Sequence, residues 1–307
     1  MSKENTAVTK KKIKRCKEDV VFDAACFIIL TLVLFVVAYP LYWVIISSIS
    51  APSAVSSGKV LLHPIGFTLK GYAEVFKNDQ VMRGFLNSLI ITFCGVMVNL
   101  IVTLPTSYAL SRSNFSGKKP ITIFYLITMF FGGGLIPTYL VIQRLQMLNT
   151  IWALILPGCL SVYNMIVART FFKSNISEEL YEAAEIDGCT QARFFFQIAL
   201  PLSKAIIAIL VLYYGVGHWN SYFSALVYIS DKAKYPLQLV LRNILITNQT
   251  ALSQTATTAA ARAALQEKQQ LIDVMKYSLI IISSILVMYP LVQKHFVKGV
   301  MIGSMKG

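Results

Sequence analysis

EELYEAAEIDGCTQARFFFQIALP, residues 178–201, is an acidic stretch in a chain that is otherwise strongly apolar. Five of the 14 Asp and Glu residues lie in its first ten positions, although 56% of the 307 residues are hydrophobic. The mean hydropathy of +0.63 indicates a protein with several membrane spans. Because carboxylates are costly inside a bilayer, we expect this stretch to lie outside it and to separate two spans.

Local signals in the stretch predict two short helices joined by a sharp turn. Ser177 is a good N-cap, and the acids that follow it stand where the positive end of a helix dipole favours them. We predict a first helix from 178 to about 186, closed by Gly188 in the left-handed conformation. Thr190 then caps a second short helix, and Pro201 begins the next span, where a missing N–H costs nothing.

The first helix carries small side chains between acids. Ala183 and Ala184 lie between Glu182 and Asp187, which permits close approach of another surface. This pattern favours a groove on a cytoplasmic protein as the partner. An amphipathic helix on the membrane surface is the alternative, but such helices usually present Lys and Arg to anionic headgroups, whereas this one presents acids.

Charge-free windows of about 20 residues, long enough to cross a ~30 Å hydrocarbon core, occur six times in the chain. They predict an all-α membrane protein with a single membrane domain, residues 21–307, which follows a basic cytoplasmic leader, residues 1–20. The six predicted transmembrane spans are 24–48, 86–110, 120–143, 150–168, 205–229 and 277–293.

The distribution of basic residues predicts which loops face the cytoplasm. Seventeen of the 28 Lys and Arg residues lie in the segments 1–20, 112–119, 169–204 and 294–307. By the positive-inside rule both termini and the loop 174–203 are therefore cytoplasmic. Loops 50–85 and 230–272 are then outside, and each either docks a partner or plugs the bundle. The Ala-rich segment 255–271 in the second loop is predicted to be helical.

The sequence shows no ATP site, metal site or paired catalytic groups. SGKKP, residues 116–120, lacks the upstream glycine and the following Ser or Thr of a phosphate-binding loop. Three dispersed histidines and five scattered cysteines form no catalytic, metal or disulfide pattern. The net charge of +14 fits basic residues beside membrane spans better than a nucleic-acid surface. We expect no catalytic residue, no bound cofactor or metal, and no nucleic-acid partner.

A route for a sugar needs hydroxyl-matching groups and aromatic faces inside the bundle, and the fifth predicted span is richest in both. Gly132 to Gly134 and Pro137 also interrupt the third span. Helix packing and interfacial anchoring are the more common reasons for such residues, so both interpretations stay open. The predicted substrate path consists of Tyr163, Asn164, Tyr214, His218, Trp219 and Asn220.

An ion-coupled secondary transporter is the alternative to a transporter that is driven from outside the chain. Secondary transporters need ionisable groups within the membrane to bind the coupling ion. The six predicted spans contain no Asp or Glu apart from Asp23 at the first boundary. This argues more strongly against proton coupling than against sodium coupling, which carbonyl oxygens could serve.

Residues 182–201 closely resemble the EAA loop of the permease subunits of bacterial ABC importers. HWN at 218–220 and the C-terminal GSMKG resemble the carbohydrate, maltose-permease type, and residues 130–158 resemble its subgroup for complex oligosaccharides and polysaccharide fragments. Cys189 departs from the alanine that is common in the family. The matching loop positions are Glu182, Ala183, Ala184, Asp187, Gly188, Phe195, Ile198 and Pro201.

The resemblance implies the type I permease fold, a non-enzymatic role in import of an oligosaccharide, and a place in the bacterial cytoplasmic membrane. It implies that the loop couples to a cytoplasmic ATPase, with Glu182 bonding its surface, Ala183 and Ala184 in close contact, and Gly188 at the bend. The implied partners are a second, related permease, a dimer of ATPase subunits that bind ATP and Mg, an extracytoplasmic sugar-binding protein, and membrane lipid.

Overall fold

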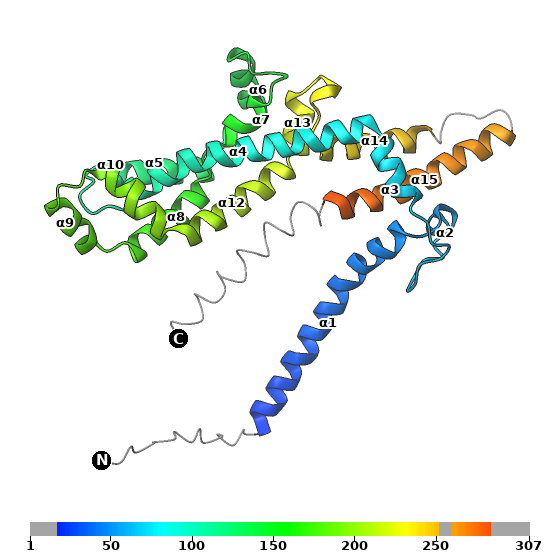
Figure 1. Cartoon of the computed structure of the whole chain (residues 1–307), viewed down its shortest axis with the longest axis horizontal. Coiled ribbons are helices and arrows are strands. Elements are labelled where there is room, and N and C mark those ends of the chain that lie inside the picture. Colours follow the sequence, from blue (N-terminus) through cyan, green and yellow to red (C-terminus); the bar gives the residue numbers. More distant parts are fainter. Residues whose placement is uncertain (1–16, 252–258, 284–307) are drawn as a thin grey trace.

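The computed structural model describes residues 17–251 and 259–283, and these residues form helices joined by turns and loops, with no strand among them. Figure 1 shows a long body built around α4, with α9 at one end and α2, α3 and α15 at the other. α1 stands away from this body. The all-α prediction is confirmed for the described part of the chain.

α4 (Asp79–Ser111) is the central helix. It begins where the Asn78 side chain accepts two backbone N–H bonds of the first turn, well before the predicted span 86–110. α8 (Val162–Asn175) and α12 (Lys204–Trp219) pack along α4 (Figure 1). α4 presents to its neighbours a stripe of buried residues at helical spacing, namely Gly84, Ser88, Ile91, Gly95, Asn99, Thr103 and Ser107.

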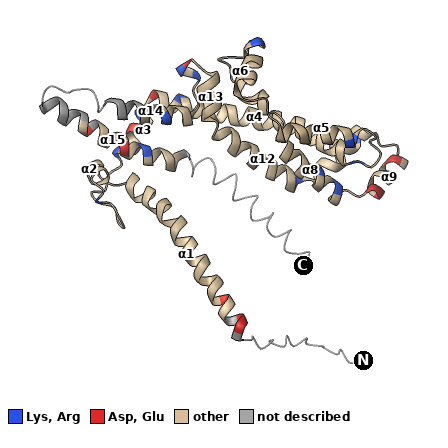
Figure 2. Cartoon of the chain, turned by 180° about the vertical axis from the view of Figure 1, so that it is seen from behind, with Lys and Arg blue, Asp and Glu red and all other residues tan. Residues whose placement is uncertain are grey.

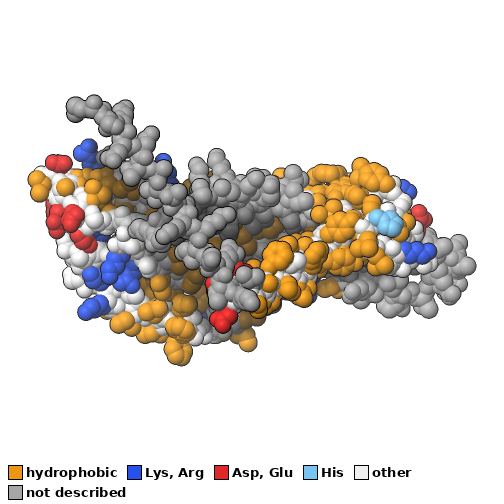
Figure 3. Space-filling view, turned by 90° about the horizontal axis from the view of Figure 1, so that it is seen from below, with side chains coloured by type: hydrophobic (Ala, Val, Ile, Leu, Met, Phe, Trp, Pro, Cys, Tyr) orange, Lys and Arg blue, Asp and Glu red, His pale blue; other side chains and the backbone are white. Residues whose placement is uncertain are grey.

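α1 (Lys17–Ser48) is apolar along most of its length, and no residue of its most apolar window is buried. Its C-terminal end is attached to the body. Trp43 Nε1 donates to the carbonyl of Val60 (2.8 Å), and the ring of Trp43 meets that of Tyr277 edge-on, with centroids 5.0 Å apart. Figure 3 shows apolar side chains over much of the described surface and charged ones mainly toward its ends, as expected for a body whose middle lies in lipid.

α2 (Pro52–Ser56), α3 (Lys70–Lys77) and α15 (Ala259–Ser283) pack together at the end of the body remote from α9 (Figure 1). Gly71 permits this close approach, because a Cβ at that position would lie 2.6 Å from Ser278 Oγ. The outer end of the body is therefore a small helical layer, and the chain does not cross this end in extended loops.

The predicted outer loops contain much of this helical layer. α14 (Leu237–Ala251) lies in the loop predicted at 230–272 and packs against α4. The helix predicted over 255–271 is confirmed from Ala259 onward and continues into α15. Residues 252–258 lie outside the described part of the chain.

The third predicted span, 120–143, is not one helix. α5 (Lys118–Phe130) and α6 (Leu135–Arg144) are bent by 113° at the break between them. Gly134 in this break has φ +87° and ψ 175°, a region of the backbone map that is essentially restricted to glycine. The glycine run, which the sequence marks as an interruption, therefore turns the chain sharply.

The fourth and fifth predicted spans, 150–168 and 205–229, are broken as well. A short helix and a 3₁₀ turn, α7 (Trp152–Ile155) and η1 (Leu156–Gly158), precede α8 with a bend of 52°. α12 stops at its C-cap Asn220, and α13 (Tyr222–Tyr228) is a separate helix. The side chain of Asn220 donates to the Val216 carbonyl (3.0 Å), which satisfies a carbonyl that the ended helix leaves free.

Among the described residues, α1 and α4 are each long and apolar enough to cross a membrane. Three bent helix pairs raise this number to five if each pair is one span. The third of these pairs joins residues 191–202 to α12. The sixth predicted span, 277–293, begins inside α15, and its residues after Ser283 lie outside the described part.

Candidate coupling site and transport path

α9 (Glu178–Ile186) is the helix predicted at 178–186. Ser177 Oγ accepts a bond from the N–H of Leu180 (3.3 Å) and satisfies one of the free donors of the first turn. Glu178 and Glu179 occupy that turn, beside the positive end of the helix dipole. The predicted start of this helix is confirmed.

A Schellman cap closes α9. The N–H groups of Gly188 and Cys189 donate to the carbonyls of Glu185 and Ala184, at 3.0 and 2.9 Å. This cap needs a left-handed residue, and Gly188 has φ +74°. The predicted glycine turn is therefore confirmed, and a side chain at position 188 would be strained even though the space around it is open.

The chain continues through α10 (Gln191–Phe194), a π-helical turn η2 (Phe195–Ala199) and α11 (Leu200–Leu202). Thr190 Oγ1 caps α10 by accepting the N–H of Arg193 (3.3 Å), as predicted. The second short helix therefore exists, but it changes its hydrogen-bond register after its first turn.

Pro201 does not begin the fifth span, as the sequence predicts. It lies in the first turn of α11, where the absent N–H leaves no helical bond unmade. The chain breaks two residues later at Ser203, and the helices on either side are bent by 80°. α12 therefore begins at Lys204.

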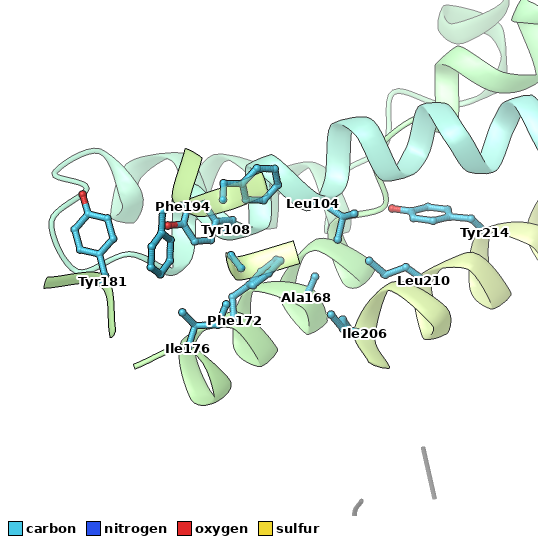
Figure 4. Close-up of a cluster of buried hydrophobic side chains, with 12 residues drawn as sticks. Leu104, Tyr108, Ala168, Phe172, Ile176, Tyr181, Phe194, Ile206, Leu210 and Tyr214 are labelled. Carbon is cyan, nitrogen blue, oxygen red and sulfur yellow. The ribbon is translucent and has the colours of Figure 1, made fainter. Parts of the chain in front are cut away.

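The inner side of α9, α10 and η2 rests on a cluster of buried aromatic residues, shown in Figure 4. The rings of Tyr181 and Phe194 meet edge-on with centroids 5.2 Å apart, and Phe195 lies 5.0 Å from Tyr108 of α4. Phe172 of α8 packs against the same Tyr108 at 5.7 Å. The two short helices are thus seated on the ends of α4 and α8.

The outer side of α9 is exposed. Glu182, Ala183, Asp187 and Gly188 face away from the cluster, and Ile186 is 88% exposed. Figure 2 shows acids on α9 at one tip of the body, with Lys and Arg on the helices beside it. The predicted coupling residues thus divide into exposed ones (Glu182, Ala183, Asp187, Gly188 and Pro201), the half-buried Ala184, and Phe195, which is buried.

Sequence reasoning missed Arg112, which follows α4 directly. Its guanidinium forms a 2.7 Å ion pair with Glu178 and lies 4.2 Å from the centre of the Tyr181 ring. The available signal was a single cation that ends a long apolar run. The residue with which it pairs is distant in the sequence, so the sequence gave no sign of the contact.

Tyr214 and His218, of the predicted substrate path, lie on the side of α12 that faces α4. The hydroxyl of Tyr214 is 2.7 Å from Thr103 Oγ1 and accepts the N–H of Ser161 (3.2 Å) at the break before α8. His218 Nε2 is 2.7 Å from Asn99 Oδ1. These bonds form a polar track through the middle of the described body.

Asn99 holds this track to the break in the fourth span. Its Nδ2 donates to the carbonyls of Gly158 (2.8 Å) and Cys159 (2.9 Å). Since both amide hydrogens are used there, Oδ1 accepts, and His218 Nε2 carries the donated hydrogen. Gly95 leaves room for the ring, because a Cβ there would lie 2.4 Å from Nε2.

The other predicted path residues lie elsewhere. Trp219 packs with Phe85 in a separate apolar cluster, Asn220 bonds to its own helix, Tyr163 is exposed, and Asn164 is buried in the first turn of α8. Asn99 and Thr103 were missed, although an Asn and a Thr four residues apart in an apolar span are a visible signal. Within residues 17–251 and 259–283, no three His, Cys, Asp or Glu residues lie close enough to bind a metal ion.

A cavity of about 560 Å³ lies between α13, α14 and α15. Its lining is largely apolar, but Tyr222, Gln238, Arg242 and Lys276 also face it. Lys276 Nζ lies 4.0 Å from the Asp273 carboxylate, whereas Arg242 has no hydrogen-bond or ion-pair partner among the described residues. The cavity is therefore cationic, and one of its charges is unpaired.

Models of known protein families do not match the chain. Curated proteins do: the chain is 35% identical to "Polygalacturonan/rhamnogalacturonan transport system permease protein YtcP" of Bacillus subtilis (strain 168), over 93% of this chain and 98% of that protein. It is 38% identical to "Protein LplC" of the same organism, over 94% and 95%. The chain belongs to the family of carbohydrate permease subunits of ABC importers.

A solved structure supports the same conclusion for the fold of the permease. It is titled "Crystal structure of a bacterial ABC transporter involved in the import of the acidic polysaccharide alginate", and the match has a TM-score of 0.81 and 26% identity over 93% of the permease and 100% of that chain. The predicted family, the carbohydrate-import function and the importer-permease fold are confirmed. The permease is a membrane protein of a non-enzymatic class, in which partner ATPases hydrolyse ATP.

Proposed function

We propose that the permease is one half of a permease pair in the bacterial plasma membrane, with six spans and both termini in the cytoplasm. The second half is a related permease. The excess of Lys and Arg in the segments beside α9 supports this orientation. Loop 174–203 is then cytoplasmic, and the helical layer of α2, α3, α14 and α15 faces outward, where an extracytoplasmic sugar-binding protein docks.

The exposed side of α9 is the docking site for one subunit of an ATPase dimer. Glu182 bonds to the ATPase surface, Ala183 and Ala184 permit close contact, and Ile186 adds an exposed apolar side chain at the centre of the contact. Asp187 and Gly188 set the bend after it. Phe195 and Pro201 act from within, by fixing the second short helix on the aromatic cluster.

ATP and Mg bind to the partner ATPase, and the permease holds neither. Its loops lack a phosphate-binding motif, and its relatives do not favour an ion-coupled mechanism. ATP binding closes the ATPase dimer, α9 moves with it, and the broken third to fifth spans reorient the path. Tyr214 and His218 lie on that path, with Tyr163, Asn164, Trp219 and Asn220 as further path residues.

The cargo is an acidic oligosaccharide. Two similar proteins carry printed names that refer to polygalacturonan, rhamnogalacturonan or alginate. In the permease, the unpaired Arg242 in the cavity beside α14 supports this choice, because a buried guanidinium is stabilised by a carboxylate. Gln238 and Tyr222 supply hydrogen-bonding and stacking groups for the sugar rings.

The first experiment is gentle purification of the permease from its native membrane, with identification of all bound proteins by mass spectrometry. An ATPase, a second permease and a sugar-binding protein are expected. Glu182→Lys and Gly188→Pro should each abolish uptake and stimulation of the ATPase while the permease stays in the membrane. Undiminished uptake by both variants would exclude α9 as the coupling element.

The cargo is tested by uptake of labelled trigalacturonate and of neutral maltotriose into vesicles that contain the purified assembly. Trigalacturonate is expected to enter and maltotriose is not, and Arg242→Gln should lower the trigalacturonate uptake. Preference for maltotriose would show that the cargo is neutral.

A further inference from the structure

Arg112 lies where α4 ends and meets a part of the chain far away in the sequence. Its Nη2 atom is 2.7 Å from one carboxylate oxygen of Glu178, the first residue of α9. The N–H of Ser113 donates to the other oxygen (3.2 Å). One carboxylate therefore holds both the side chain and the backbone at the end of α4. The Arg112 side chain is only 12% exposed, although Glu178 is 43% exposed.

The guanidinium group is also surrounded by aromatic rings. Its central carbon lies 4.2 Å from the centre of the Tyr181 ring, 5.8 Å from Tyr108 and 5.9 Å from Phe194. These rings belong to α9, α4 and α10, and they attract a cation through their negative faces. A single side chain thus touches all three elements at this junction.

The backbone beneath Arg112 is fixed independently of α9. The last carbonyls of a helix have no helical partner, and here cations from neighbouring helices bind them. Arg169 of α8 donates to the Leu110 carbonyl (3.0 Å), and Lys118 of α5 donates to the carbonyls of Arg112 (3.2 Å) and Ser113 (2.9 Å). Arg112 therefore extends to α9 from an end of α4 that is already anchored.

We propose that Arg112 is the positioning residue that transmits the movement of α9 to α4. The proposal rests on the proposed function, in which the ATPase docks on the exposed side of α9. The exposed residues of the EAA loop face that partner, so they cannot form the link to the membrane helices. Arg112 forms it, and α4 carries the movement onward to α8 and α12, which pack along it.

Arginine suits this position better than lysine does. The planar guanidinium pairs with a carboxylate in its own plane while its faces stack on aromatic rings, and an ammonium group cannot do both. The pair between Lys77 and Glu74 on α3 offers a contrast. It is 3.4 Å long, its side chains are 73% and 38% exposed, and it is an ordinary surface pair within one helix turn.

The test uses the assembled importer in lipid nanodiscs, with its native cysteines replaced by serine. Spin labels at position 179 on α9 and position 97 on α4 report the distance between the two helices with and without ATP and vanadate. The variants are Arg112→Gln, Arg112→Lys and the control Lys77→Gln. We also measure how much ATPase stays bound to each variant. This readout does not depend on the identity of the sugar.

Without a mutation, the distance should stay unchanged on addition of ATP and vanadate, because the two helices move together. Arg112→Gln should retain the ATPase but show a shifted and broadened distance distribution, Arg112→Lys should show a smaller shift, and Lys77→Gln should show none.

An Arg112→Gln importer that retains the ATPase and has the unmutated distances would overturn this role while leaving the proposed function intact. Loss of ATPase binding or of thermal stability in both Arg112 variants would also overturn it, because Arg112 would then only support folding. If the unmutated permease retained no ATPase, the proposed function itself would fail.

Discussion

α1 and α4 are similar in length and composition but differ in how they pack. α1 has 32 residues and α4 has 33, each contains one proline, and each is apolar enough to cross a membrane. None of the most apolar window of α1 is buried, whereas 28% of the corresponding window of α4 is. Hydropathy alone does not tell the central helix from the peripheral one.

The difference lies in the small and polar residues on one side of α4. Gly95, Asn99 and Thr103 recur every four residues and are buried, and α1 has no such repeat between Cys26 and Trp43. Lipid tails are as apolar as leucine, so helices associate in a bilayer through close packing and hydrogen bonds. A span with such a stripe is drawn into the bundle, and a span without one faces lipid.

The same stripe supplies hydrogen bonds where neighbouring segments are not helical. Asn99 binds two carbonyls at the break before α8, and Ser88 Oγ accepts the N–H of Leu237 (2.8 Å) at the start of α14. Broken backbone is tolerated in a membrane only where protein groups or water satisfy it. α4 thus permits the breaks that make the other spans bend.

The largest effect is expected for Asn99→Leu. It leaves the carbonyls of Gly158 and Cys159 and the Nε2–H of His218 without a partner, and each buried unsatisfied group costs about 1–3 kcal/mol. The thermal midpoint of the purified permease should fall, and uptake should be lost. Asn175→Leu is the control, since it removes a bond within one exposed turn of α8. Equal midpoints for the two variants would contradict the role given to α4.

A smaller loss is expected for Gly95→Ala. The added Cβ would lie 2.4–2.7 Å from three atoms of the His218 ring, so the ring must move away from Asn99. Overpacking of this kind costs about 1–3 kcal/mol. The control is Gly217→Ala on α12, where no atom lies within 4 Å of the added carbon and the helix should be stabilised slightly. The two thermal midpoints should move in opposite directions.

The coupling loop was largely predictable because its signals are local. The caps by Ser177 and Thr190 and the turn at Gly188 each depend on residues within a few positions, and all three are present. The position of Pro201 was misjudged because proline tolerates the first turn of any helix, and nothing local indicated the break at Ser203.

The contacts between distant segments were not predictable in the same way. Arg112 meets Glu178, and Asn99 meets His218, only because α4 runs beside α9 and α12 in the fold. A single sequence states which residues are polar but not which of them meet. The extent of a span suffered similarly, because the bends at Gly134 and Ser203 depend on how the flanking helices pack.

Tyr214→Phe should have a modest effect. It removes the hydroxyl that bonds to Thr103 and Ser161, and hydrogen bonds between membrane helices average about 0.6 kcal/mol. The thermal midpoint should drop slightly, with a larger effect on uptake if the hydroxyl also meets the sugar. Tyr213→Phe is the matched control, because the neighbouring Tyr213 is 47% exposed. Identical uptake by the two variants would remove Tyr214 from the path.

The smallest effect is expected on α1. Leu30→Ala and Phe35→Ala truncate side chains that are 68% and 69% exposed, so they leave no cavity in the protein, and the thermal midpoint of the isolated permease should stay at that of the unmutated chain. Leu210→Ala on α12 is the contrast, because Leu210 is fully buried and such truncations cost about 2–5 kcal/mol. A drop for the α1 variants in the isolated permease would mean that α1 packs within its own chain. A drop confined to the assembled importer would place α1 against a second chain. Either result would end the contrast with α4, since both helices would then be held by protein.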